Sequence, residues 1–242
     1  MALSWQAFWG GSHRIYVNQR HLQAHYRQIA ADLIALLADR PGAVLLDYGC
    51  GDALASPALA AAGLQVVLYD AVPAVSQRVA ARFAGAKGIA VLDEAAWAAQ
   101  PAASLDVILV NSVLQYLPAD ALDHLLPRFR QLLRPDGVLL LADVIPPEAG
   151  MHPDIAALLA AGWRHGFLLA ALLGMAATFF SDYRRLRREL GLATWSEAAL
   201  RARLAAHGFS ADRMARNIGF SPHRMLIRGR PAGTVNVPFR HS

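Results

Sequence analysis

A short apolar segment that delivers an acid into a glycine loop is the feature that most constrains this chain. Residues 43–47 are apolar up to Asp47, and Gly49 and Gly51 follow within four positions. The apolar run predicts a buried strand, and the glycines predict a tight loop. Glycine lacks a Cβ atom, so the backbone can pass close to a ligand, and a helix beginning after the loop offers free N–H groups. The pattern predicts a nucleotide-type binding loop at the start of an α/β domain.

Strand and helix patterns alternate along the next hundred residues. Further strands are predicted at 65–69, 87–92, 105–110 and 138–144, with helices at 19–39, 53–62, 73–83 and 118–133. Short links between alternating strands and helices favour a doubly wound, mostly parallel sheet. After Pro146-Pro147 the pattern changes. Helices are predicted within 153–207, and two closing strands at 209–216 and 223–230.

Two cofactor classes use a loop of this kind. A dinucleotide fold requires Gly-x-Gly-x-x-Gly/Ala, with a small third residue for close packing of helix on strand. Here that third position holds the bulky Leu54, and the acid Asp47 is not part of that template. A second acid, Asp70, ends the next predicted strand, where a ribose would lie. These features argue against a nicotinamide-dependent oxidoreductase.

The same residues resemble the first motif of the class I S-adenosylmethionine-dependent methyltransferases, Asp/Glu-x-Gly-x-Gly-x-Gly. Asp47, Gly49 and Gly51 match that motif, and Ala53 replaces its last glycine. In that family the loop wraps the methionine and ribose part of the cofactor. The acid that closes the second strand, here Asp70, accepts hydrogen bonds from both ribose hydroxyls.

Two later segments extend the resemblance to roughly residues 40–145. Residues 105–118 resemble the fourth-strand motif, and residues 133–141 resemble the Leu-x-Pro-Gly-Gly segment before strand five. The resemblance implies an α/β fold with a seven-stranded, mostly parallel, Rossmann-like sheet and a helical insertion before the last two strands. We expect one domain over 1–242: an N-terminal helical cap (1–40), a cofactor-binding half (41–150), a helical lid (151–195), and a closing helix and strands (196–242).

The resemblance implies a set of site residues. We expect S-adenosyl-L-methionine to be held by Asp47, Gly49, Gly51, Asp70, Asp93 and Asn111. Asp93 or its neighbour Glu94 would approach the adenine amino group. The acceptor would contact Tyr16 and His25, which come from the N-terminal cap, and Tyr116.

No catalytic residue is assigned. Gln115 and Tyr116 occupy the positions where small-molecule enzymes of this family often have two histidines. A glutamine cannot act as a base near neutral pH, and a tyrosine has a reference pKa of about 10. Methyl transfer is a direct displacement that can proceed by holding donor and acceptor in line, so an obvious base is not required. His21 and His25 have metal-ligand spacing, but no third ligand follows in pattern, so no metal is expected.

The basic charge is concentrated in the last two-fifths of the chain. Residues 1–150 contain 10 basic and 13 acidic residues, whereas residues 151–242 contain 13 basic and 5 acidic ones. Within 166–188 an apolar run of 15 residues precedes four arginines, and about 20 residues would be needed to span a membrane. This segment is either an interfacial anchor on an anionic membrane surface or a buried lid helix with a solvated basic end. No nucleic-acid partner is expected, because no interleaved aromatic and basic stretch is present.

The function predicted from the sequence is methyl transfer from S-adenosyl-L-methionine to a small, hydrophobic or lipid-like acceptor. The alternative is a cofactor-binding or non-catalytic scaffold module of the same fold. Cys50 is the single cysteine, which fits a reducing compartment. We therefore expect a cytoplasmic protein, or one peripheral at the inner membrane face. The sequence does not indicate an oligomeric state.

Overall fold

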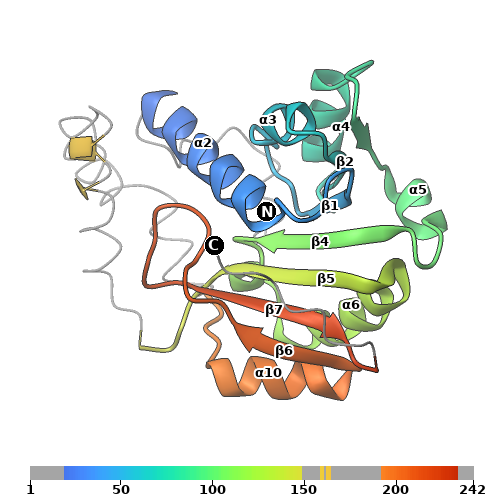
Figure 1. The fold of residues 1–242 in the computed structure, drawn as a ribbon, viewed down its shortest axis with the longest axis vertical. Coiled ribbons are helices and arrows are strands. Elements are labelled where there is room, and N and C mark those ends of the chain that lie inside the picture. Colours follow the sequence, from blue (N-terminus) through green and yellow to red (C-terminus); the bar gives the residue numbers. More distant parts are fainter. Residues whose placement is uncertain (1–18, 149–158, 161, 165–191, 234–242) are drawn as a thin grey trace, which may run out of the picture.

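A seven-stranded sheet organises the computed structural model, which describes residues 19–148, 159–160, 162–164 and 192–233 (Figure 1). The strand order is β3-β2-β1-β4-β5-β7-β6. β1 to β5 pair in parallel, and β7 runs antiparallel to both β5 and β6. This confirms the predicted mostly parallel, doubly wound sheet. The strands are β1 Val44–Tyr48, β2 Gln65–Tyr69, β3 Ile89–Val91, β4 Leu105–Asn111, β5 Leu133–Val144, β6 Phe209–Arg213 and β7 Met225–Pro231.

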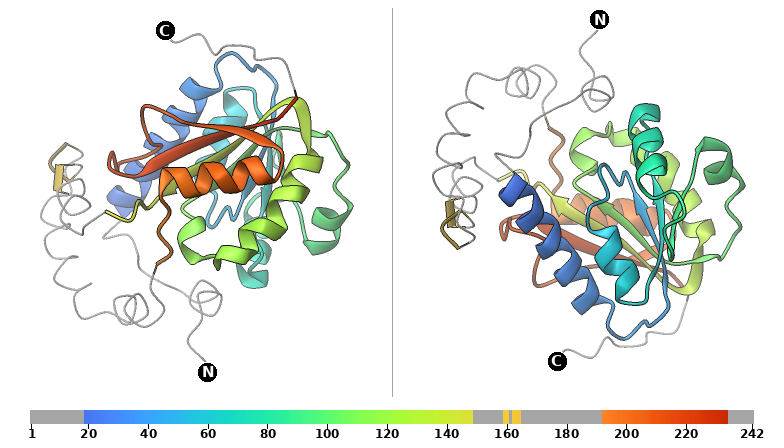
Figure 2. Two further views of the ribbon diagram at one scale, coloured as in Figure 1. Left: turned by 90° about the horizontal axis from the view of Figure 1, so that it is seen from below. Right: turned by 90° about the horizontal axis from the view of Figure 1, so that it is seen from above.

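Helices cover both faces of the sheet, as Figures 1 and 2 show. On one face α2, α3 and α4 pack against alternate strand residues such as Leu45 and Leu109. On the other face α5, α6 and α10 pack against the intervening residues, such as Leu46 and Ile108. Both sides of the central strands are therefore buried, which is why β4 has a nearly continuous apolar sequence. The helices are α2 Gln19–Leu36, α3 Ser56–Ala61, α4 Pro73–Arg82, α5 Glu94–Ala99, α6 Ala119–Leu132 and α10 Glu197–Ala206, with a 3-10 turn, η1, at Leu114–Tyr116.

Two local details differ from the sequence prediction. The helix predicted from residue 53 begins at Ser56, because Ala53 has φ +51° and belongs to the turn that closes the glycine loop. No element was predicted between the third and fourth strands, but the structure has the short helix α5 there. The Asp93 carboxylate caps this helix by accepting from the Ala96 N–H at 2.8 Å.

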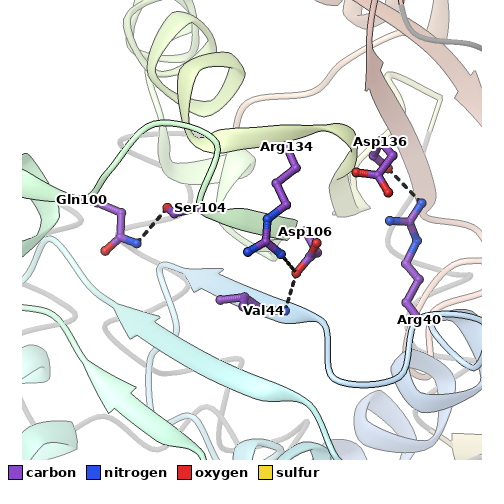
Figure 3. Close-up of polar contacts among 7 residues, drawn as sticks. All are labelled: Arg40, Val44, Gln100, Ser104, Asp106, Arg134 and Asp136. Atoms are coloured by element: carbon purple, nitrogen blue, oxygen red, sulfur yellow. Dashed lines mark hydrogen bonds and ion pairs between the residues drawn. The ribbon is translucent and has the colours of Figure 1, made fainter.

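Polar contacts fasten the amino ends of the central strands (Figure 3). Asp106 of β4 accepts a hydrogen bond from the Val44 N–H of β1 at 2.8 Å and from Arg134 of β5 at 2.5 Å. Arg40 donates to the Asp136 carbonyl at 2.9 Å. These contacts fix the three strands relative to one another. These contacts lie at the amino ends of the strands, opposite the carboxyl ends where parallel α/β sheets bind ligands.

Only part of the predicted lid is described. The described residues 159–160 and 162–164 are helical, and the rest of 149–191 lies outside the described residues, as does Tyr16. Among the described helices, none is both long enough and apolar enough to cross a membrane.

Candidate cofactor and acceptor site

The loop that follows β1 has a backbone conformation that favours glycine. Gly49 has φ +75° and Gly51 has φ +54°. The Gly49 and Cys50 N–H groups both donate to the Tyr69 carbonyl, at 2.8 and 3.1 Å, which ties the loop to the end of β2. A Cβ atom on Gly49 would come within 2.6 Å of Val113 Cγ2, whereas a Cβ atom on Gly51 would meet nothing within 4 Å. Gly49 is therefore required for packing, and Gly51 borders open space.

Asp70 joins the glycine loop to the start of α4. Its carboxylate accepts from the Gly51 N–H at 3.0 Å and from the Val72 N–H at 2.9 Å. An ionised carboxylate offers about four lone-pair sites, so two backbone bonds leave capacity for hydroxyl donors. Burial raises the pKa of Asp70, while its two backbone hydrogen bonds and Arg78 act in the opposite direction. The predicted ribose ligand is thus held in a fixed orientation beside the loop.

Asp47 is a half-buried carboxyl group at the end of β1. Burial, and then the nearby charge of Asp70, raise the pKa of Asp47 to about 7. Burial and the neighbouring negative charge both disfavour ionisation of Asp47. A bound cation would favour its ionisation. The pair therefore suits a ligand that carries positive charge and hydroxyl groups.

The other predicted cofactor residues lie at the same edge of the sheet. Asp93, at the end of β3, caps α5, and Glu94 accepts from the Tyr69 hydroxyl at 2.6 Å. Asn111 is the last residue of β4. Their placement at strand ends agrees with the expectation, and their roles toward a cofactor stay predictions.

The N-terminal helix brings His25 toward the turn between β6 and β7. The His25 ring lies 5.7 Å from the Phe220 ring, centroid to centroid, and Asp32 accepts from the Gly219 N–H at 2.8 Å. Burial, and then the charge of His21, lower the pKa of His25 to about 4, so the imidazole is neutral near pH 7. Tyr116, the third predicted acceptor residue, is half-buried in η1.

A polar cluster lies at the ends of β4 and β5. The sequence already points to two of its members, Ser112 just past the fourth strand and Asn217 in the turn between the closing strands, but not to Asp143. The Ser112 hydroxyl donates to Asp143 Oδ2 at 2.7 Å. The Asp143 N–H in turn donates to Asn217 Oδ1 at 3.0 Å. The signal that could have found it is the parallel register, which pairs Asn111 with Ala142 and so places the residues after them side by side.

Gln115 Oε1 and Trp195 Nε1 are buried and have no hydrogen-bond partner in the described part of the chain. The segments that carry them are adjacent, because the Ala193 N–H donates to the Gln115 carbonyl at 3.0 Å. A buried polar atom without a partner costs free energy. The 3-10 turn after β4 therefore contains a buried carbonyl oxygen that no described residue satisfies.

The geometry fits S-adenosylmethionine. An open glycine, an oriented carboxylate with spare lone pairs and a second acid all lie at the carboxyl ends of β1 and β2.

Comparison with known proteins decides the family. The family described as "Methyltransferase domain" matches residues 20–213. The chain belongs to the class I S-adenosylmethionine-dependent methyltransferases.

Relatives with curated names support this assignment. A Nocamycin O-methyltransferase from Saccharothrix syringae is 32% identical over 209 residues, covering 72% of each chain. A Carboxy-S-adenosyl-L-methionine synthase from Dichelobacter nodosus is 32% identical over 170 residues, covering 68% of this chain and 67% of the other.

Solved structures share the fold. The 1,6-didemethyltoxoflavin-N1-methyltransferase of Burkholderia thailandensis, solved with its substrate and S-adenosylhomocysteine, aligns with a TM-score of 0.55 at 22% identity, covering 86% of this chain and 79% of the other. The magnesium protoporphyrin IX methyltransferase of Synechocystis PCC 6803, with S-adenosylhomocysteine bound, aligns with a TM-score of 0.56 at 20% identity, covering 93% and 92%. The methyltransferase is therefore an enzyme that uses S-adenosylmethionine, and the prediction of cofactor and fold is confirmed.

Proposed function

We propose that this methyltransferase acts on a small, mainly apolar acceptor, which it methylates at a polar atom. The observation that carries the proposal is the pairing of an apolar contact and a polar cluster beside the carboxyl ends of β4 and β5. A neutral His25 packs beside Phe220, and a compact polar cluster, Ser112–Asp143–Asn217, lies at the adjoining strand ends. The neutral aromatic side chains favour an uncharged, apolar acceptor. The polar cluster supplies the few hydrogen bonds that would orient this acceptor.

The roles of the residues toward the cofactor follow from their placement. Asp70 is positioned to accept hydrogen bonds from the ribose hydroxyls, because its carboxylate is oriented by Gly51 and Val72. The Gly51 region gives the backbone close access to the ligand. A bound sulfonium would favour ionisation of Asp47, whose pKa is raised to about 7 by burial and by Asp70. When bound, the cofactor supplies a methyl group on a sulfonium. The protein holds the acceptor in line with that group and excludes water.

The curated relatives suit a small acceptor. The Saccharothrix relative is named for O-methylation of nocamycin, and the Burkholderia neighbour was solved with bound 1,6-didemethyltoxoflavin. Both names describe small molecules.

The proposal is tested by methyl transfer from labelled S-adenosylmethionine. The full chain would be incubated with a panel of small phenols, alcohols and amines and with an organic-solvent extract of the source cells. We expect label in organic-soluble small molecules, identified by mass spectrometry. Label only in protein or nucleic acid would contradict the proposed acceptor class. S-adenosylhomocysteine binding without any transfer would support the scaffold alternative.

The membrane hypothesis for residues 166–188 concerns a segment outside the described residues, and it stays a proposal. Among the described residues near it, Trp163 is 80% exposed. Co-sedimentation with liposomes tests the hypothesis. We expect binding that needs anionic lipid and weakens with salt. Equal binding to neutral vesicles, or none to anionic ones, would leave the buried-lid interpretation.

A further inference from the structure

Two residues in left-handed backbone conformation face each other at the ends of β4 and β5. Ser112 has φ +58° and Asp143 has φ +56°. Among the described residues, only four that are not glycine have positive φ, and these two are joined by the hydrogen bond from Ser112 Oγ to Asp143 Oδ2. Non-glycine residues adopt this conformation at a cost that folds retain mainly at functional sites. The pair is therefore a candidate for a role beyond packing.

The surrounding contacts fix the position of the Asp143 carboxylate. Its N–H donates to Asn217, and Asn217 Nδ2 donates to the Ser221 carbonyl at 3.1 Å, so the turn after β6 supports the strand end. The Ser112 N–H donates to the Ala142 carbonyl at 3.2 Å. The Asp143 backbone is thus held by contacts from the segments on either side, and the Ser112 hydroxyl orients its half-buried carboxylate.

The cluster lies next to the cofactor loop. Val113, which follows Ser112, packs so closely on Gly49 that a Cβ atom there would clash at 2.6 Å. β1 and β4 are neighbours in the sheet, and this boundary is where the strand order reverses. Open α/β sheets bind their ligands at the carboxyl side of that boundary. Asp143, at the end of β5, is joined through Ser112 to the end of β4, which is one of the two strands at that boundary.

We propose that Asp143 accepts the hydrogen bond of the acceptor's O–H or N–H group and receives its proton when the methyl group is transferred. The acceptor's lone pair forms the new bond to the methyl carbon. The carbon–sulfur bond breaks with its electrons remaining on sulfur, and the acceptor's proton passes to the carboxylate. The acceptor is accordingly a small molecule that is methylated on oxygen or nitrogen. This inference rests on the proposed function and names the reacting group of its substrate.

The test compares variants for two separate readouts, label transfer to the small-molecule product of the parent enzyme and calorimetric binding of S-adenosylhomocysteine. Asp143→Asn is expected to lower transfer by about 100-fold or more, the usual effect of removing a general base. Ser112→Ala is expected to lower it by about tenfold, the loss of one hydrogen bond. Asp136→Asn makes the same chemical change at the opposite end of β5, on an exposed side chain, and is expected to retain full transfer. Both site variants should bind S-adenosylhomocysteine within about twofold of the parent.

The pH profile separates proton transfer from a structural role. The residual activity of Asp143→Asn, relative to the parent, should rise with pH as the acceptor ionises without help. Parallel profiles, full transfer by Asp143→Asn, or loss of S-adenosylhomocysteine binding by that variant would each overturn the inference while leaving the proposed function standing. Absence of any methylated small molecule with the parent enzyme would overturn the proposed function and this inference with it.

Discussion

The contact between Gly49 and Val113 gives a quantitative prediction about the glycine loop. Gly49→Ala places a Cβ atom 2.6 Å from Val113 Cγ2 at a residue with φ +75°. The left-handed conformation costs an alanine about 1–2 kcal/mol. Overpacking adds about 1–3 kcal/mol. We therefore expect the free energy of unfolding to fall by about 2–5 kcal/mol.

Gly51→Ala is the matched control. Its φ is +54°, but a Cβ atom there meets nothing within 4 Å, so only the conformational cost of about 1–2 kcal/mol applies. The added methyl group borders the open space assigned to the cofactor. We therefore expect Gly51→Ala to weaken S-adenosylhomocysteine binding more than its small loss of stability suggests.

A double-mutant cycle with Val113→Ala isolates the clash. Urea denaturation of the parent, both single variants and the double variant gives the coupling free energy. We expect Val113→Ala to recover the overpacking part of the Gly49→Ala loss, about 1–3 kcal/mol, but not the conformational part. The reasoning is refuted if Gly49→Ala is no less stable than Gly51→Ala, or if Val113→Ala recovers nothing.

Three further predictions concern stability. Burial and Asp70 raise the pKa of Asp47 to about 7. Between pH about 4 and about 7 the folded chain therefore keeps a proton on Asp47 that the unfolded chain has lost. The free energy of unfolding should consequently fall as pH rises across that range. Urea denaturation across that range should show a smaller slope for Asp47→Asn, and an unchanged slope would contradict the assignment. Gln115→Leu removes a buried carbonyl oxygen that has no partner among the described residues. Thermal melting should show that the variant without cofactor is more stable by up to about 1–3 kcal/mol. Its methyl transfer should be reduced. Asp106→Ala removes the acceptor for Arg134 and for a β1 N–H, so it should cost about 1–3 kcal/mol while calorimetry shows unchanged S-adenosylhomocysteine affinity.

The strands and the cofactor loop could be predicted from the sequence because each leaves a local signal. The apolar run before Asp47 is buried on both faces, and the glycines mark the loop in which φ is positive. Asp70 could be predicted as well, because it directly follows the second predicted strand. Helix α5 was missed because six residues give too short a periodic pattern, although Asp93 is an ordinary N-cap.

The contacts among the residues proposed for acceptor binding could not be predicted in the same way. The cluster joins three segments that are distant in the sequence, and Asp143 lies outside the motifs that the sequence shows. Ser112 and Asp143 have left-handed backbone conformations, which the sequence pattern did not indicate. His25 was predicted from its place in the N-terminal cap, but its contact with Phe220 depends on how α2 packs beside the turn after β6.

The central claim is that Asp70 and the glycine loop form the S-adenosylmethionine site of a methyltransferase. Calorimetric titration with S-adenosylhomocysteine tests it most directly, with the parent chain and with Asp70→Ala, each checked for folding by thermal melting. We predict that the parent binds and that Asp70→Ala, while folded, binds at least about tenfold more weakly, because the ribose loses its charged hydrogen-bond acceptor. Equal affinity for the two proteins, or no binding to the parent at millimolar ligand, would contradict the account.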